Sequence, residues 1–319
     1  MITSHKLLII HQGALGDIVA IFPVIIRLTS YYNCIDVLCQ SQPGRLAKHL
    51  GLVQKWFPLE DASVSSLFSD QPDPRITARL RPYSKVVLFS FSEQLEQALN
   101  QITQNRCIRL APKPPADPPI HITLYAMQNL MQGGLLASED LNPNYAYLPI
   151  PPVGITNSSP DRRKILLHPG SGSKRKRWPL SGFKQVESVL RTNGLKTEFI
   201  LGPAEKDLLS ALQKRDRKVH LPGDLLELAG LYETAGGYIG NDSGASHLAA
   251  FMGLATVVVF GPADPRRWKP NGPRVEVVRP ALECRPCFET DRANCSEPKC
   301  LDHTIPQTII DAFYRVYKN

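Results

Sequence analysis

The chain has 319 residues, 43% hydrophobic and 21% charged, which excludes a disordered protein and predicts two globular domains. No stretch approaches the ~20 apolar residues of a membrane-spanning helix, because the longest apolar run, Ile18–Ile26, is interrupted by Pro23. The N-terminal run Lys6–His11 is too short for a signal peptide, so we expect a cytoplasmic protein. The net charge of +8 suits a nucleotide, a phosphorylated glycolipid, an acidic membrane or nucleic acid, and equally a basic surface that binds nothing.

Short apolar runs alternate with helical stretches over the first 150 residues. This alternation indicates parallel βαβ units. The expected strands are residues 7–11, 35–39 and 86–91, and the expected helices are residues 18–30, 46–50 and 93–101. Between Leu141 and Arg163 the pattern gives way to Pro, Asn, Ser and Gly, which predicts a linker.

The alternation restarts after the linker, where Lys164–His168 resembles the opening strand Leu7–His11. Near-continuous apolar strands flanked by helices imply a parallel sheet covered on both faces. The expected strands are residues 164–168, 197–201, 237–240 and 255–260, and the expected helices are residues 180–191, 205–213, 225–234 and 245–252. We therefore predict an α/β protein with two doubly wound, Rossmann-like domains, at 1–150 and 163–305, and a C-terminal helix at 306–319.

Ligands of parallel α/β sheets bind at the carboxyl ends of strands, and four loops of this chain lie at such places. The first is Gly13-Ala-Leu-Gly-Asp17, whose glycines permit a tight turn. It is neither a dinucleotide-binding fingerprint nor a P-loop. Asp17 is placed either to cap the following helix or to act as a general base.

The second loop, His168–Pro179, follows a strand with small residues and then four consecutive cations, Lys-Arg-Lys-Arg. Its backbone N–H groups and serine hydroxyls suit a phosphate, with a cation to neutralise the charge. A run of cations is also typical of a solvated surface or of a nucleic-acid patch.

The third and fourth loops are Gly202–Glu205 and Gly240–His247. Glu205 suits a helix cap or a ribose contact, and Asp242 can accept hydrogen bonds from sugar hydroxyls. N–H groups from Ser243 onward can face a phosphate. His247, one turn inside the expected helix, is either part of the site or a buried core histidine.

Clustered carboxylates for a metal–diphosphate are absent from the sequence, which contains no Asp-x-Asp pair. Near the C-terminus, however, four cysteines lie within 17 residues, at Cys284, Cys287, Cys295 and Cys300. Their spacing suits a small zinc site without a catalytic role, while disulfides and free thiols remain open alternatives.

These loops together resemble the ADP-heptose lipopolysaccharide heptosyltransferases, the glycosyltransferases of family 9. The matching segments are GALGD, HPGSGSKRKRWP, GPAEK, GNDSGASHLAAFMG and FGPADPRRW. They follow one another over most of the chain, and the match is weakest between residues 40 and 160, where substrate-specifying residues are expected.

The resemblance implies a GT-B fold, with an acceptor domain, a nucleotide-donor domain and a cleft between them. It implies that Asp17 is the general base and that Lys176 binds the donor phosphate. The remaining donor-binding residues that it implies are Ser171, Gly172, Ser173, Glu205, Asp242, Ser243, Gly244 and His247.

The implied reaction is an inverting transfer without a catalytic metal, from ADP-heptose or another nucleotide sugar to an anionic, lipid-linked saccharide. Asp17 takes the acceptor proton, Lys176 and the helix after Ser243 meet the charge of the leaving ADP, and domain closure expels water. Such an acceptor places the protein at the inner face of the cytoplasmic membrane, and no nucleic-acid partner is expected. The alternatives are a nucleotide-sugar 2-epimerase of the same fold and a nucleotide- or nucleic-acid-binding protein without turnover.

Overall fold

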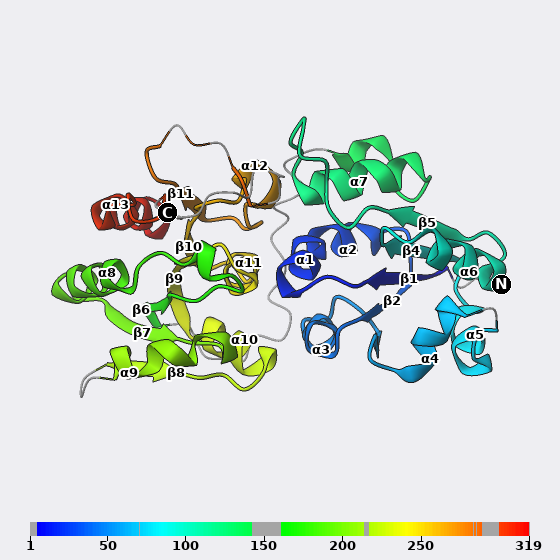
Figure 1. Cartoon of the computed structure of the whole chain (residues 1–319), viewed down its shortest axis with the longest axis horizontal. Helices are drawn as coiled ribbons and strands as arrows, with labels where there is room; N and C mark the ends of the chain where they lie inside the picture. The colour runs from blue at the N-terminus through cyan, green and yellow to red at the C-terminus, as the bar shows by residue number, and fades with distance from the viewer. Residues whose placement is uncertain are drawn as a thin grey trace. The chain divides into compact units, whose positions relative to one another are not determined.

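The computed structural model describes residues 5–69, 71–141, 161–213, 217–282, 284, 286–288 and 300–318. The chain divides into two compact units (Figure 1). The first comprises Met1–Pro115 and Ile120–Leu148, and the second comprises Ala116–Pro119 and Pro149–Asn319. Each unit is built on one parallel sheet, so the predicted fold class is confirmed.

The first sheet has five parallel strands in the order β3-β2-β1-β4-β5. The chain builds outward from central β1 to one edge, returns to the centre, and then builds to the other edge. The strands are β1 (Lys6–His11), β2 (Cys34–Cys39), β3 (Lys55–Pro58), β4 (Lys85–Phe89) and β5 (Cys107–Leu110).

Both faces of this sheet are buried. Leu8 and Ile10 point to a core that includes residues of three α-helices on one side, and the alternate residues Leu7 and Ile9 are buried on the other. The helices of this unit are α1 (Leu15–Ala20), α2 (Phe22–Leu28), α3 (Ser41–His49), α4 (Ala62–Ser65), α5 (Pro74–Leu80), α6 (Glu93–Thr103) and α7 (Ile122–Gln132).

The second sheet has six parallel strands in the order β11-β10-β9-β6-β7-β8, again built outward from the centre in both directions. Its strands are β6 (Asp161–His168), β7 (Lys196–Ile200), β8 (Lys218–His220), β9 (Ala235–Asn241), β10 (Ala255–Val259) and β11 (Val275–Val278). Its α-helices are α8 (Leu180–Thr192), α9 (Leu209–Leu212), α10 (Leu225–Glu233), α11 (Gly244–Phe251), α12 (Pro265–Trp268) and α13 (Pro306–Tyr317), and two 3₁₀ helices are η4 (Lys174–Lys176) and η5 (Pro203–Leu208).

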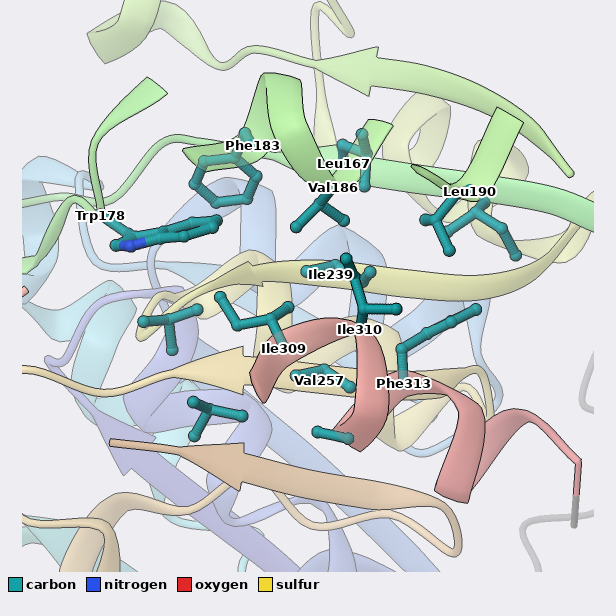
Figure 2. Packing of buried hydrophobic residues seen from close by; sticks show 14 of the residues in the cluster. Leu167, Trp178, Phe183, Val186, Leu190, Ile239, Val257, Ile309, Ile310 and Phe313 are labelled. Atoms are coloured by element: carbon teal, nitrogen blue, oxygen red, sulfur yellow. The ribbon is translucent and has the colours of Figure 1, made fainter. Parts of the chain in front are cut away.

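The core of the second unit lies between its sheet and the pair α8 and α13 (Figure 2). Phe183 of α8 and Phe313 of α13 are fully buried against strand residues such as Ile239 and Val257. Deleting one such aromatic side chain costs about 3–5 kcal/mol. The C-terminal helix is thus part of the second unit's core and covers β10 and β11.

Several predicted elements differ from the structure. The helix expected at 46–50 is the longer α3, which begins at Ser41. The helix expected at 18–30 is two helices that meet at Ile21, because Pro23 near the start of α2 has no N–H to continue α1. The helix expected at 205–213 is the 3₁₀ helix η5 followed by one turn of α9. Most of the predicted linker lies outside the described residues, but Asp161–Arg163 belong to β6.

The edge strands were missed in both sheets. β3, β5, β8 and β11 have three or four residues each and lack a long apolar run. Within the described part of the chain, no helix has the length and apolar character needed to cross a membrane.

Candidate functional site

The strand order of each sheet identifies where a ligand is expected. In the first unit the chain reverses its direction of growth between β1 and β4, and in the second between β6 and β9. Loops at the carboxyl ends of such neighbouring strands form the binding crevice of doubly wound sheets. The first predicted loop follows β1, while the second, fourth and third follow β6, β9 and β7, which are neighbours. The structure therefore brings the three loops of the second unit to one edge.

Asp17 lies at the third position of α1 and not before it. The N-cap residue is Ala14, and Asp17 Oδ2 accepts a hydrogen bond from the Ala14 N–H at 2.9 Å. The interpretation of Asp17 as the N-cap residue was thus wrong in position, although its carboxylate does cap the helix from inside the first turn. The positive end of the helix dipole favours the ionised carboxylate there.

His11, the last residue of β1, is hydrogen-bonded to this loop. Its Nδ1 accepts a hydrogen bond from the Gly13 N–H at 3.0 Å, and its ring lies 4.8 Å from that of Phe89. Complete burial lowers the pKa of His11 to about 4, so the ring is neutral with its proton on Nε2. A Cβ at Gly13 would lie 2.6 Å from His11 Cε1 and 2.7 Å from Asp17 Cβ, so only glycine fits between them.

The four cations of the second loop have different surroundings. Lys174 is exposed, whereas Arg175, Lys176 and Arg177 are half-buried. Arg177 donates hydrogen bonds to the carbonyls of Ser171 at 3.2 Å and Ala204 at 3.0 Å. The interpretation as a solvated surface therefore holds only for Lys174. Arg177 joins the second loop to the third through these hydrogen bonds.

Lys176 and Asp242 bring the second and fourth loops together. Lys176 Nζ lies 2.8 Å from Asp242 Oδ2, and the Asp242 carboxylate is 6% exposed. The hydroxyl of Ser171 donates to the Asp242 carbonyl at 2.8 Å, so the two loops are also joined through backbone. Of the next two residues of the second loop, Gly172 is exposed and Ser173 is half-buried.

Asn241, the last residue of β9, completes this junction. Its side-chain Nδ2 donates to the Pro169 carbonyl at 2.8 Å, and its Oδ1 accepts from the Trp178 N–H at 2.9 Å. Asn241 is fully buried. Sequence reasoning missed it, although its place between a strand and Asp242 was a usable signal.

Glu205 is buried beneath the second loop. Its Oε2 accepts from the Gly202 N–H at 2.8 Å, and its Oε1 lies 3.3 Å from the Arg177 guanidinium. A side chain at Gly170 would overlap this carboxylate. The interpretation of Glu205 as a cap is confirmed, whereas its contact with a ribose stays a prediction.

His168 ends β6 as His11 ends β1. Its Nδ1 lies 3.1 Å from the Tyr238 hydroxyl and its Nε2 lies 3.9 Å from Glu205 Oε2. Burial, and then the nearby Arg177 charge, lower the pKa of His168 to about 4. A neutral histidine therefore stands at the start of both the first and the second loop.

The fourth loop leads into α11, where Ser243 is the N-cap residue and its Oγ accepts from the Ser246 N–H. Gly244 and the residue after it have no acceptor for their N–H groups within the helix, which favours an anion at this end. His247 is buried in the first turn of α11, 5% exposed.

The cysteine cluster is described only in part. Cys284 is exposed, Cys287 and Cys300 are half-buried, and Cys295 lies outside the described residues. Among the residues that the structure describes, no disulfide is present and no three His, Cys, Asp or Glu side chains gather as a metal site.

The chain is similar to known proteins. The family model described as Glycosyltransferase family 9 (heptosyltransferase) matches residues 137–297. Lipooligosaccharide heptosyltransferase 2 of Campylobacter jejuni is 28% identical over 167 residues, which are 49% of this chain and 52% of the relative, so the match spans about half of that protein.

Two solved structures resemble the whole chain. The glycosyl transferase family 9 protein from Veillonella parvula aligns with a TM-score of 0.77 and 16% identity, over 99% of this chain and 98% of the other. The E. coli ADP-heptose lipopolysaccharide heptosyltransferase II aligns with a TM-score of 0.69 and 16% identity, over 98% of each chain. Both likenesses concern the fold, which is the predicted GT-B type.

Proposed function

Because the chain belongs to glycosyltransferase family 9, the heptosyltransferase family, we propose that it is a glycosyltransferase that transfers a heptose or related sugar. The donor is an ADP-sugar, and the acceptor is a lipid-linked saccharide of the lipopolysaccharide-core type. The ADP-heptose named for one fold neighbour and the lipooligosaccharide named for the sequence relative support this choice of substrates.

The observation that carries the proposal is the Lys176–Asp242 pair at the point where the second sheet reverses direction. An ammonium group beside the N-terminus of α11 provides the two positive elements that a diphosphate needs. Asp242 holds Lys176 in this place and has a carboxylate that can accept from sugar hydroxyls. This combination suits a phosphate joined to a sugar better than it suits a phosphate alone.

We assign the other donor contacts to the loops around this pair. Ser171, Gly172 and Ser173 border the diphosphate, and Glu205 faces the ribose from below the second loop. Ser243 and Gly244 begin the helix that meets the phosphate charge, and His247 supports them from inside its first turn. The bonds of Ser171, Arg177 and Asn241 keep these loops in one arrangement before the donor arrives.

In the proposed mechanism Asp17 is the general base. It takes the proton of the acceptor hydroxyl while that oxygen forms a bond to the anomeric carbon of the donor. The bond between the anomeric carbon and the diphosphate oxygen breaks, its electron pair leaves with ADP, and the configuration is inverted. Lys176 and the N-terminus of α11 meet the charge that develops on ADP, so no catalytic metal is required.

A transfer assay tests the proposal. ADP-heptose and a truncated lipopolysaccharide acceptor are incubated with the enzyme, with and without EDTA, and the product's anomeric configuration is read by NMR. We expect an inverted, EDTA-resistant product. Donor converted to an isomer without an acceptor would instead identify a 2-epimerase, and loss of turnover with EDTA would contradict the metal-free mechanism.

Lys174 supplies a matched control for the donor site, because it belongs to the same run of cations but is exposed. Lys176→Met should weaken ADP binding about 10- to 150-fold, the effect of losing a charged hydrogen bond, and Lys174→Met by less than twofold. Calorimetric titration measures both. Equal losses in the two variants, or DNA binding with a steep salt dependence and no ADP binding, would favour the nucleic-acid alternative.

We also propose that Cys284, Cys287, Cys295 and Cys300 hold a structural zinc ion, since four thiolates suit tetrahedral zinc. The cysteines have no part in the transfer step. Elemental analysis of the purified protein should find zinc, and Cys284→Ser should lose it. Iron in place of zinc would correct the metal, and a disulfide detected by mass spectrometry would contradict the site.

A lipid-linked acceptor leads us to propose peripheral association with the inner face of the cytoplasmic membrane. The net charge of +8 favours anionic lipid surfaces. The protein should sediment with vesicles that contain anionic lipid and be released by salt. Equal sedimentation with neutral vesicles would contradict the electrostatic basis.

A further inference from the structure

Phe288 contacts the cation at the centre of the proposed donor site. Its ring centroid lies 4.1 Å from Lys176 Nζ, and the Arg175 guanidinium lies 5.8 Å from the same ring. A cation within about 6 Å of a ring centroid is attracted by the negative face of the ring. Phe288 thus contacts two consecutive cations of the second loop.

The backbone holds this ring in place. The N–H groups of Cys287 and Phe288 both donate to the carbonyl of Pro262, at 2.8 and 3.0 Å. Pro262 lies in the loop that follows β10, the strand next to β9. Phe288 is therefore anchored to the same edge of the sheet as the loops that hold Lys176 and Asp242.

The Lys176 ammonium group can still donate a hydrogen bond to a ligand in this arrangement. An ammonium group has three N–H donors, and the Lys176 nitrogen lies 2.8 Å from Asp242 Oδ2, as an ion pair, and 4.1 Å from the Phe288 ring centroid. With three donors and these two neighbours, at least one N–H is left for a phosphate oxygen. A lysine side chain is otherwise flexible, and binding a ligand with it costs conformational entropy unless it is already held.

We propose that Phe288 is a positioning residue of the donor site, which holds the Lys176 ammonium between its ring and Asp242 so that it meets the donor diphosphate in place. The inference rests on the proposed function, because it requires that Lys176 binds the donor. Phe288 acts through Lys176 and need not touch the sugar or the acceptor. The predicted signature is a dependence of ADP affinity on the electrons of the ring and not on its size.

The test is a titration of the full-length protein with ADP, in which Phe288 is replaced by Leu, Tyr, or phenylalanines with increasing numbers of fluorine atoms. Fluorine withdraws electron density from the ring face and changes its shape little. We expect an about fivefold higher Kd for Phe288→Leu, a near-normal Kd for Phe288→Tyr, and a stepwise rise along the fluorinated series. Phe68→Leu, at an exposed phenylalanine of the first unit, is the control and should leave Kd unchanged.

A double-mutant cycle with Lys176→Met separates positioning from general stability. If Phe288 acts through Lys176, Phe288→Leu should add nothing once Lys176 is replaced. Unchanged affinity along the fluorinated series, or additive effects in the cycle, would overturn the role of Phe288 while leaving the glycosyltransferase proposal intact. A wild-type protein that does not bind ADP would overturn both.

Discussion

The central strand of each sheet, β1 in the first unit and β6 in the second, ends in a buried histidine followed by a glycine-containing loop. Burial lowers the pKa of both His11 and His168 to about 4. Their partners differ. Among the described residues, His11 Nε2 has no hydrogen-bond partner and Nδ1 meets only the Gly13 N–H, whereas His168 lies between Tyr238 and Glu205.

This difference extends to the loops themselves. The first loop is short and enters α1 directly, so that its acidic residue, Asp17, lies within the first helical turn. The second is longer and is joined to its neighbours by Ser171, Arg177 and Asn241. A loop braced in this way suits fixed charges that receive a ligand. In the proposed function the first loop presents one reactive group, the Asp17 carboxylate.

The largest expected effect should separate the proposed role of Asp17 in turnover from donor binding by the second unit. Asp17→Asn keeps the size of the side chain and removes the base, so turnover should fall about 10²- to 10⁴-fold. The affinity for ADP should stay within twofold of wild type, because the assigned donor residues all belong to the second unit. Steady-state kinetics and ADP titration measure the two quantities separately.

Glu139 supplies the control for this variant, as an exposed carboxylate of the first unit. Glu139→Gln should leave both quantities unchanged. If Asp17→Asn weakened ADP binding as much as turnover, the assignment of separate roles to the two loops would be wrong.

The two histidines predict a common dependence of stability on pH. Each has a folded pKa of about 4 against an ordinary value of 6.5, so between these values the unfolded chain binds more protons. The stabilisation is full above about pH 6.5 and is lost as the pH falls toward 4, by about 3 kcal/mol for each histidine.

Urea unfolding at pH 7.5, 6.0 and 5.0 checks this expectation. Replacing either His11 or His168 by Gln should remove part of the slope, and replacing both should remove most of it. A wild-type stability that is the same at pH 5.0, 6.0 and 7.5 would show that neither ring is kept neutral by the fold.

Much of the fold could be predicted from local sequence patterns. The elements that were predicted wrongly or missed have physical explanations. Buried strands inside the sheets, such as β1 and β10, are continuous apolar runs and were predicted. Edge strands such as β3 and β8 depend on pairing with a neighbour, which a local pattern does not contain. The break at Ile21 was signalled by Pro23, but the apolar residues around it continue the helical pattern.

In the candidate site, too, some features were predictable from local sequence and others were not. Loop positions after strands predicted that Lys176, Asp242 and Glu205 lie at one edge of a sheet, where the structure has them. Their partners were not predictable, because Tyr238 lies 70 residues from His168 and Phe288 lies 112 residues from Lys176. Such contacts arise from the order of strands, and the sequence contains no local trace of them. Whether these residues bind the donor stays a prediction.

Glycine substitutions test the comparison within a single loop. A Cβ at Gly170 would overlap the Glu205 carboxylate, which Arg177 and Gly202 hold in place, so Gly170→Ala should destabilise the protein by about 1–3 kcal/mol. A Cβ at Gly172, two residues on, would meet no described atom within 4 Å, and Gly172→Ala should change stability by less than about 0.5 kcal/mol. Thermal and urea unfolding measure both. Equal effects would contradict the packing of Glu205 under the loop.

The smallest of the expected losses concerns the Tyr238 hydroxyl. Tyr238→Phe removes a hydroxyl that lies 3.1 Å from both His168 Nδ1 and Ser246 Oγ, and should cost about 1 kcal/mol of unfolding free energy. Ser246 Oγ donates to the Asn241 carbonyl, next to Asp242, so the loss should also reach the donor loops as a two- to threefold higher Kd for ADP. A loss of stability without a change in Kd would show that the hydroxyl stabilises the sheet but not the loop. In that case the hydrogen bond between Tyr238 and His168 would have no part in the proposed donor site.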